Sequence, residues 1–548
     1  GGKVGKKSDK KEEISQVKLM EIAKALVDKT MLLSIFTYFK HDNVDDCFKS
    51  LEEDNTIVEG IGDLERKMYL ETLLLGMNDV DKVDLGVIKF IYDNIFDKEI
   101  VNKKIYLFNQ KVNLIYNNIR ENPDIIDIML GNLMELVDSY LKPSNTEKKM
   151  LGEVFTSLKL VEEMLDKLPK EVWSNPNLKW LDPANGIGNF PVIIVKNLME
   201  GLKEWQPDSE LRLKHILENM IYVCELQSKN MFIYLQLFDS DNKYKMSFHR
   251  GSFLDEGFSG VMKEWGVEKF DVIVGNPPYQ ELKTGNKKSQ SLWDKFVEKS
   301  IKLLSEGGYV SFIHPSGWRD IDGLFKQTQK VMIDKEILYL SIHSEKDGIK
   351  NFKADTRYDY YVIRNIINSG DFLTKIRCQD GSIIESKLYN MEFIPNGMFN
   401  EISNILAKNG DEKVMIISDS SYHTQREFMS NSESSVNKYP CIYTVRNGDI
   451  PTFWYSDKNT NGHFGIPKLI WSNGRIISVG SLVDKDGRYA LSQFSYAIVD
   501  DPQNLDDIKK SFDSKKFRDM MENCSVANMS INRKIIATFK KDFWKEFI

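Results

Sequence analysis

Four consecutive residues, Asn276-Pro277-Pro278-Tyr279, follow the apolar run at 271–275 and end it with an amide, two prolines and a phenol. Proline has no N–H group to donate to a sheet ladder, so a strand must end where the prolines begin. The residue before each proline is also held extended. The Asn276 amide and the neighbouring carbonyl groups are therefore held stiffly at the end of a strand, and the tetrapeptide predicts a rigid hydrogen-bond acceptor site.

A second candidate site lies in the stretch WLDPANGIGNFP, residues 180–191. An apolar run ends at Asp182, Gly186 and Gly188 follow, and a helical pattern begins near Phe190. Glycines in such a turn let a ligand approach the backbone closely, and the first N–H groups of the helix can bind it. A G-x-G turn is weak evidence by itself, because plain strand-to-helix turns share it.

Two further apolar runs end in polar residues. The run IYVCEL ends in Glu225, where nucleotide-binding folds place an acid that binds ribose hydroxyls, although a solvated glutamate is the simpler interpretation. The stretch HRGSFLD, residues 249–255, stands where a third strand should end. Four consecutive strand ends thus carry polar, Gly or Pro residues at one sheet edge, which is where open α/β sheets bind ligands.

In this order, the segments GEVFTSLKLVEEML, LDPANGIGNF, CEL, GSFL and VGNPPYQ resemble the S-adenosylmethionine-dependent N6-adenine DNA methyltransferases. The order of the motifs is that of type I modification subunits and type IIG restriction-modification enzymes. The resemblance covers residues 149–366 well and the C-terminal region more loosely. It implies S-adenosylmethionine as cofactor and double-stranded DNA as partner.

The resemblance gives the tetrapeptide a catalytic role. Asn276 Oδ1 and the Pro277 carbonyl would accept the two N–H groups of adenine N6, and Pro278 would help to keep the pair rigid. Tyr279 would stack on a target base that has been rotated out of the duplex, and Phe352 would cover its opposite face. For both aromatic residues the alternative is a place in the hydrophobic core.

The resemblance also implies a set of cofactor-binding residues, namely Phe155, Thr156, Asp182, Ala184, Gly186, Gly188, Asn189, Phe190, Glu225, Ser252, Phe253 and Asn276. Asp182 would orient the amino-acid part of the cofactor and Glu225 would bind its ribose. Carboxylates suit a cationic sulfonium better than a polyphosphate. The sequence also lacks the G-x-x-x-x-G-K-[ST] motif of many ATPases, so an ATPase is not predicted.

Three positions depart from the family pattern. Ser157 stands where proline is usual, and Asn185 stands where a small residue or cysteine is common. A loop that binds through its backbone tolerates both. Ser252 replaces an aspartate that binds the adenine amino group of the cofactor, while Phe253 can still stack on the adenine ring.

The patterns of helices and strands around these residues divide the chain into four predicted regions. We predict a flexible arm at 1–16, a helical N-terminal domain at 17–148, a methyltransferase domain at 149–366 and a target-recognition domain at 367–548. The fold class is α/β, with a Rossmann-like doubly wound sheet preceded by an all-helical domain and followed by a mixed α/β domain.

Composition sets limits on function. No apolar run approaches the roughly 18 residues needed to span a bilayer, and the charged start does not resemble a signal peptide, so we predict a cytoplasmic protein without membrane partners. The 5 cysteines and 7 histidines are not spaced as metal ligands, so no metal site is predicted. A net charge of -7 argues against a uniformly basic surface but not against a basic cleft.

The outer domains are less informative. In the recognition domain, Arg446, Lys468 and Arg475 lie among aromatic residues and are candidates for DNA contacts, although ordinary solvated charge is the alternative for each. The helical domain could contact DNA, cover the cofactor domain or bind a partner subunit. Its E-x-K sequence at Glu65 lies in a helical pattern, so no nuclease is predicted there.

These observations predict a DNA adenine N6-methyltransferase that acts alone or within a restriction-modification or related defence or epigenetic system. The same chemistry also occurs in methyltransferases of RNA and of protein glutamine, which usually lack a large domain after the sheet. A catalytically inactive DNA-binding subunit is the alternative from another class. The intact Asn276 tetrapeptide argues against it.

Overall fold

The computed structural model describes Glu99 and residues 156–226, 228–239, 244–280, 290–321, 323–352, 354–527 and 529–548. Phe155, the predicted arm at 1–16 and, Glu99 apart, the predicted helical domain at 17–148 lie outside the described residues. The chain divides into two compact units. The first comprises Gly1–His314, Asn351–Lys353 and Tyr360–Ile366, and the second comprises Pro315–Lys350, Ala354–Asp359 and Ile367–Ile548. The predicted domain boundary at 366 stays a prediction.

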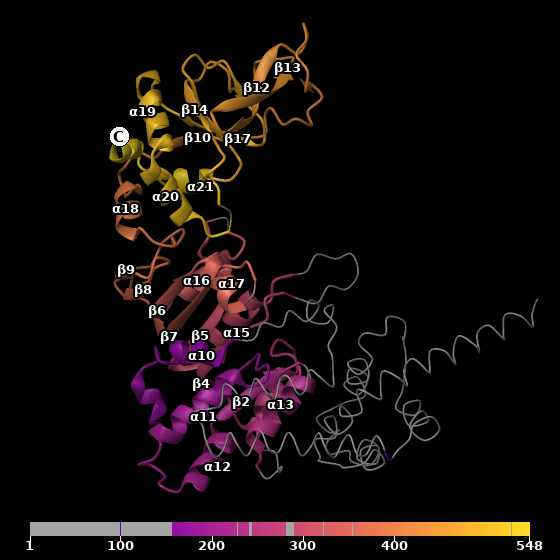
Figure 1. The fold of residues 1–548 in the computed structure, drawn as a ribbon, viewed down its shortest axis with the longest axis vertical. Coiled ribbons are helices and arrows are strands. Elements are labelled where there is room, and N and C mark those ends of the chain that lie inside the picture. The colour runs from indigo at the N-terminus through magenta and orange to yellow at the C-terminus, as the bar shows by residue number, and fades with distance from the viewer. Residues whose placement is uncertain are drawn as a thin grey trace, which may run out of the picture. The chain divides into compact units, whose positions relative to one another are not determined.

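The first unit is built around strands in the order β3-β2-β1-β4-β5-β7 (Figure 1). Their bounds are β1 (Trp180–Asp182), β2 (Ile221–Glu225), β3 (Ser247–Arg250), β4 (Phe270–Gly275), β5 (Leu304–Pro315) and β7 (Tyr358–Ile367). The pairs β1/β2, β2/β3, β1/β4 and β4/β5 are parallel. The strand order reverses between β1 and β4, which confirms the predicted doubly wound sheet and marks the crevice in which such sheets bind ligands.

Helices of the first unit pack around this sheet. They are α10 (Leu158–Leu165), η2 (Lys170–Trp173), α11 (Asn189–Gly201), α12 (Ser209–Asn219), α13 (Ser228–Asp239), α14 (Phe258–Trp265) and α15 (Trp293–Leu303). Helix α11 contacts both α10 and α12, while α12 and α13 contact β2 (Figure 1). Trp180 and Leu181 of β1 are fully buried. Strands covered on both faces read as apolar runs without alternation, as the sequence indicates.

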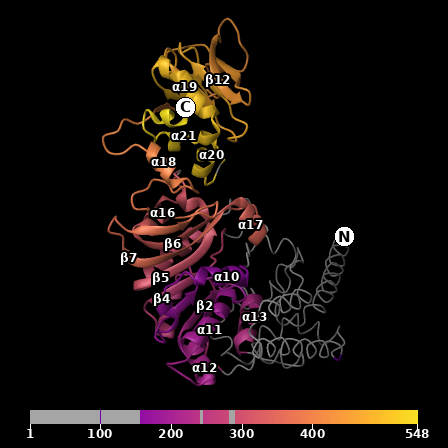
Figure 2. The same ribbon diagram turned by 60° about the vertical axis from the view of Figure 1, so that its left-hand side comes forward.

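The second unit holds three groups of strands and its own helices (Figure 2). Strand β6 pairs with β8 in parallel and β8 pairs with β9 antiparallel, and two four-stranded sheets have the orders β10-β17-β14-β15 and β11-β13-β12-β16. The strands are β6 (Lys335–His343), β8 (Leu373–Arg377), β9 (Ile383–Lys387), β10 (Met415–Ile417), β11 (Met429–Ser430), β12 (Tyr439–Arg446), β13 (Ile450–Ser456), β14 (Lys468–Ser472), β15 (Ser481–Asp484), β16 (Ala490–Leu491) and β17 (Ser495–Val499). This architecture confirms a mixed α/β region after the methyltransferase sheet.

The second unit and its border with the first also contain helices. They are η3 (Ser316–Arg319), α16 (Lys326–Ile333), α17 (Glu345–Phe352), α18 (Phe399–Ile405), α19 (Pro502–Asp513), α20 (Lys515–Cys524), α21 (Arg533–Ile536) and η4 (Phe543–Phe547). Side chains of α19, α20 and η4 pack with Trp471 of β14 in a large apolar cluster. The C-terminal residues of the chain are therefore part of the core of the second unit.

A buried ion pair joins separate segments of the second unit. Arg319 and Asp359 are both fully buried, and Arg319 Nε donates to Asp359 Oδ2 at 2.7 Å. The remaining guanidinium donors bind the Ile394 carbonyl and Asn396 Oδ1, and Ser316 and Trp318 donate to the Asp359 carboxylate. Every charged group in this network has partners, which is the condition for burying charge without a large penalty.

The described part of the chain contains no helix long and apolar enough to cross a membrane. Nor do its His, Cys, Asp and Glu residues form a cluster that could hold a metal ion. The four described cysteines are buried and unpaired.

Replacement of Arg319 by methionine should destabilise the second unit strongly. The variant leaves the Asp359 carboxylate buried with fewer donors, and breaking a buried pair from one side costs about 3 to 5 kcal/mol. Urea unfolding followed by circular dichroism would measure the loss. Lys387→Met is the control, because its pair with Asp371 is exposed and should contribute less than about 1 kcal/mol. Equal unfolding midpoints for the two variants would refute the assigned role of the Arg319 network.

Candidate active site

The candidate site begins where β1 and β4 end side by side. The two strands are parallel with Leu181 opposite Ile273, so Asp182 and Gly275 follow at the same edge. Gly275 has a φ of 155°, and a Cβ at this position would lie 2.8 Å from Asp182 Oδ1. Only glycine permits this approach. Gly275 was not among the predicted site residues, although a glycine directly before the Asn276-Pro277-Pro278 segment was a readable signal.

Thr156 ties three distant segments together at this edge. Its Oγ1 accepts a hydrogen bond from Asn276 Nδ2 at 3.0 Å, and its backbone carbonyl accepts one from Asn189 Nδ2. Thr156 is 3% exposed. Because the Asn276 nitrogen is held by the hydroxyl, the plane of the amide and the direction of Oδ1 are fixed. The structure thus brings together three residues that the sequence analysis assigned to one site.

The next residue, Ser157, helps to hold the Thr156 backbone by capping α10. Its side chain accepts a hydrogen bond from Leu160 N and caps the N-terminus of α10. Serine is among the best N-cap residues, whereas proline has no hydroxyl to serve as a cap. The departure from the family pattern at Ser157 therefore has a local structural reason.

The loop after β1 is fastened to β2 through its backbone. Asn185 N donates to the Cys224 carbonyl at 2.8 Å, and Gly186 N donates to Glu225 Oε2 at 2.6 Å. Gly188 has a φ of 101° and precedes α11 as its N-cap, and a Cβ there would lie 2.7 Å from the Tyr234 ring. The two predicted glycines thus serve a tight turn, as expected.

The other predicted residues of this loop occupy two environments. Ala184 is half-buried, and its N–H donates to Asp182 Oδ1 at 3.1 Å. Phe190 is buried in the first turn of α11. Phe190 is therefore placed to support the helix start, and a direct cofactor contact by its side chain stays a prediction.

Burial dominates the electrostatics of Asp182. The side chain is 2% exposed, and this burial raises the pKa of the carboxyl well above its usual range, with the Glu225 carboxylate adding to the effect. Within the described residues, Asp182 Oδ2 has no hydrogen-bond partner. A positively charged group beside Asp182 would favour the ionised carboxylate, so the loop suits a cationic ligand.

The ends of β2 and β3 lie next to the loop. Gly251 N donates to the Glu225 carbonyl at 3.0 Å. Ser252 Oγ accepts from Leu254 N, while Asp255 Oδ2 accepts from Ser252 N, each at 3.1 Å. Ser252 therefore serves a reciprocal turn-capping arrangement of the S-x-x-D type.

Phe253 lies in the core of the first unit. It is fully buried against the rings of Phe258 and Phe296, and Lys299 Nζ lies 4.8 Å from its ring centre. A ring enclosed in this way offers no open face to a ligand. Because the Phe253 ring has no exposed surface, stacking on the cofactor adenine would require its neighbours to move, and this contact stays a prediction.

The predicted base-binding residues occupy partly exposed positions. Pro277 is buried, Pro278 and Tyr279 are half-buried, and the Tyr279 carbonyl accepts a hydrogen bond from Leu292 N at 3.2 Å. Phe352 is the half-buried last residue of α17. Stacking of Tyr279 and Phe352 on a target base stays a prediction.

The three predicted DNA contacts in the second unit differ from one another. Arg446 and Arg475 are exposed. Lys468 is fully buried, and its ammonium binds Asp484 Oδ2 at 2.8 Å and the carbonyls of His463 and Ile466 at 3.2 Å. An ammonium with all three donors engaged inside the core cannot reach a phosphate, so the structure contradicts the prediction for Lys468.

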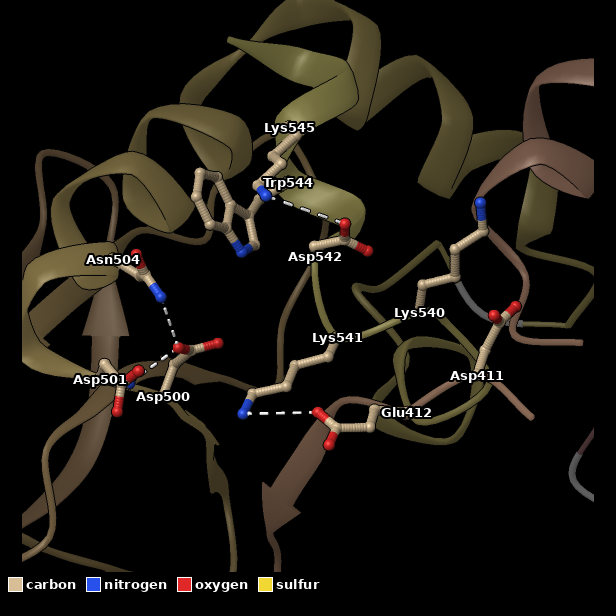
Figure 3. Close-up of a pocket in the computed structure, with 10 residues that line it drawn as sticks. All are labelled: Asp411, Glu412, Asp500, Asp501, Asn504, Lys540, Lys541, Asp542, Trp544 and Lys545. Carbon is tan, nitrogen blue, oxygen red and sulfur yellow. Dashed lines mark hydrogen bonds and ion pairs between the residues drawn. The ribbon is translucent and has the colours of Figure 1, made fainter.

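A pocket of about 380 Å³ in the second unit does not suit an anion such as phosphate (Figure 3). Lys541 pairs with Glu412 at 3.7 Å and Lys545 pairs with Asp542 at 3.9 Å. Carboxylates outnumber ammonium groups in the lining, which comprises Asp411, Glu412, Asp500, Asp501, Asn504, Lys540, Lys541, Asp542, Trp544 and Lys545. Such a lining repels phosphate overall, so we assign this pocket no role in DNA binding.

Comparison with known proteins agrees with this geometry. Residues 178–356, which include β1, β4 and the Asn276 tetrapeptide, match the model of the Eco57I restriction-modification methylase family. The match is confined to this segment of the chain. The predicted resemblance to adenine-specific methylases of restriction-modification systems is thereby confirmed, and the assignment implies S-adenosylmethionine as the methyl donor.

Individual relatives cover parts of the chain. An uncharacterized adenine-specific methylase of Mycoplasma pneumoniae is 28% identical over 37% of this chain and 60% of its own length. The type II restriction enzyme and methyltransferase RM.Eco57I of Escherichia coli is 23% identical over 36% of this chain and 25% of its own length. The type IIL restriction-modification enzyme MmeI, solved in complex with DNA, is 13% identical with a TM-score of 0.40, covering 90% of this chain and 83% of that one. The chain therefore spans 60% or less of these two curated sequence relatives.

The sheet edge formed by β1, β2 and β4 has chemical groups that suit S-adenosylmethionine. This cofactor carries a sulfonium and an ammonium, both cationic, and Asp182 offers a buried carboxylate oxygen without a partner in the described part of the chain. Thr156, Glu225 and the loop at 183–188 lie around the same sheet edge. The edge formed by β1, β2 and β4 is therefore the candidate site for the cofactor, and binding there stays a prediction.

Replacement of Asp182 by asparagine should stabilise the ligand-free protein in a pH-dependent way. A raised folded-state pKa means that this group stabilises the fold fully below its ordinary value of 3.8, and that the contribution is lost as pH rises through the raised value. Asparagine retains an acceptor for Ala184 N and does not ionise. Thermal melts should therefore show a gain for Asp182→Asn that grows with pH, whereas a pH-independent difference would contradict the burial argument.

Proposed function

We propose that this protein is a site-specific DNA adenine N6-methyltransferase that acts on a flipped-out adenine in double-stranded DNA. It would belong to a restriction-modification or related defence or epigenetic system. The hydrogen bond from Asn276 to the Thr156 hydroxyl carries this proposal, because it fixes an amide acceptor beside the loop that starts at Asp182. The descriptions of the Mycoplasma pneumoniae and Escherichia coli relatives as methylases support the reaction class.

The reaction requires activation of a weak nucleophile. The lone pair of adenine N6 is conjugated into the ring, so the amine must move towards tetrahedral geometry before it can attack. Asn276 Oδ1 and the Pro277 carbonyl accept its two N–H groups and favour that geometry, and their fixed positions avoid reorganisation during the reaction. S-adenosylmethionine supplies a methyl group activated by its sulfonium, and Asp182 stabilises the cationic ligand in the ground state.

The second unit would supply contacts to DNA. Arg446, at the end of β12, is bridged to Val479, and Arg475 lies four residues before Val479. Arg518 donates to the carbonyls of Ile476 and Val479 and holds the turn that connects them. Two exposed arginines thus lie on neighbouring segments of the fold, and their side chains are candidates to bind backbone phosphates or base edges.

Replacement of Asn276 by alanine should abolish most methyl transfer without preventing cofactor binding. Loss of one preorganised acceptor lowers the rate by about 10² to 10³-fold. Transfer of labelled methyl groups to double-stranded DNA would be measured beside RNA and protein acceptors, and cofactor affinity would be measured by calorimetry. Equal rates for the variant and the unaltered protein would refute the acceptor role. Transfer to RNA or protein in preference to DNA would overturn the proposed substrate.

Replacement of Arg446 or Arg475 by alanine should weaken DNA binding. If each side chain contacts one phosphate, each substitution should lower the slope of log affinity against log salt by about 1. Fluorescence anisotropy with a labelled duplex would measure both affinity and slope. Lys485→Ala is the control, since Lys485 is half-exposed in the same unit and paired with Asp506 at 2.7 Å. The DNA-contact assignment fails if the arginine variants match this control.

A further inference from the structure

The side chain of Asn185 is buried without hydrogen-bond partners. It is 4% exposed, and across the described ranges of the chain neither Oδ1 nor Nδ2 has a partner within reach. Its backbone is fully used, because the N–H donates to the Cys224 carbonyl and the carbonyl accepts from Gly188 N. Buried side-chain amides are normally hydrogen-bonded, and an amide left without partners is unfavourable for the folded state. The side chain therefore calls for an explanation beyond the fold of the loop.

Asn185 lies in a short stretch that carries several such atoms. Asp182 Oδ2 precedes it and Asn189 Oδ1 follows it, and both are buried with no partner among the residues that the structure describes. Other buried polar atoms without partners, such as those of Arg212, Ser300 and Ser311, are spread over separate elements. The loop from Asp182 to Asn189 thus offers acceptor oxygens of a carboxylate and two amides, together with the two N–H donors of Asn185.

This combination of groups matches a zwitterion. The ammonium of an α-amino acid requires acceptors, which the Asp182 carboxylate and the amide oxygens supply, while its carboxylate requires donors such as Asn185 Nδ2. The amino-acid part of S-adenosylmethionine has both charges, whereas its nucleoside part has neither. Resting on the function proposed above, we propose that the Asn185 side chain binds the amino-acid part of S-adenosylmethionine. This contact adds to the binding by the loop backbone.

A ligand-binding role and a structural role for Asn185 predict different effects of removing its side chain. A side chain that served the fold would lower stability when removed. Removal of a buried amide without protein partners should instead leave the ligand-free protein equally stable or more stable, while ligand affinity falls. The alternative is an internal water that satisfies the amide, in which case Asn185 would have no preference among ligands.

Asn185→Ala would be tested by calorimetry with S-adenosylmethionine and with 5′-methylthioadenosine, which lacks the amino-acid part. The variant should bind S-adenosylmethionine about tenfold more weakly, as expected for the loss of one hydrogen bond to a charged group, and should bind 5′-methylthioadenosine unchanged. Its melting temperature without ligand should equal or exceed that of the unaltered protein. Asn365→Ala is the matched control, because its amide is bonded to the Leu304 and Ser305 carbonyls, so melting temperature should fall without a change in ligand preference.

These measurements separate a failure of the Asn185 contact from a failure of the proposed function. Equal weakening of both ligands in Asn185→Ala, no weakening of either ligand, or a lower melting temperature without a change in affinity would overturn the role of Asn185 alone. Failure of the unaltered protein to bind S-adenosylmethionine would overturn the proposed function and, with it, this contact.

Discussion

The hydrogen bond between the Thr156 hydroxyl and the Asn276 amide is the constraint on which the proposed chemistry depends. An asparagine at a strand end can turn its amide in several directions, and only a fixed orientation makes it an acceptor of defined position. The hydroxyl fixes it, and the Ser157 cap at the start of α10 holds the Thr156 backbone in place. The same threonine also binds Asn189 at the start of α11 through its carbonyl. One residue thus sets the relative positions of the acceptor and the loop that would hold the methyl donor.

The second constraint is the close approach of β1 and β4. Gly275 lets the end of β4 pass against the Asp182 carboxylate, and a Cβ at this position would collide with Asp182 Oδ1. The resulting site concentrates negative charge in a buried place, where Asp182 is ionised only at a cost. A cationic ligand removes that cost. Ionisation of Asp182 is therefore unfavourable in the ligand-free loop and would become favourable beside a sulfonium cofactor. We regard this as the reason why the loop contains a buried acid.

In the second unit, unlike at Asp182, the buried charged side chains have partners within the protein. Its buried charges, Arg319 with Asp359 and Lys468 with Asp484, are fully hydrogen-bonded and serve the fold. Of its exposed cations, Arg446 ends β12 and Arg475 directly precedes the turn at 476–478, which Arg518 holds through backbone carbonyls. Segments that are far apart in the sequence meet in its core, since Asn396 binds the Ser525 carbonyl and the C-terminal helices pack on Trp471. The proposed contacts with DNA would benefit from this rigidity, because binding would otherwise have to order the surface.

The sequence by itself determined the sheet class, the order of the strand-end motifs and the family that the central segment resembles. It did so because prolines, glycines and apolar runs act on the backbone locally, and their effects can be read without knowing what lies nearby in space. Only the tertiary structure decided which polar groups meet, such as Thr156 with Asn276, and which side chains are enclosed, such as Phe253 and Lys468. Burial and long-range hydrogen bonds depend on packing between distant segments. A lysine among aromatic residues therefore reads the same in the sequence whether it faces a phosphate or pairs with an aspartate in the core.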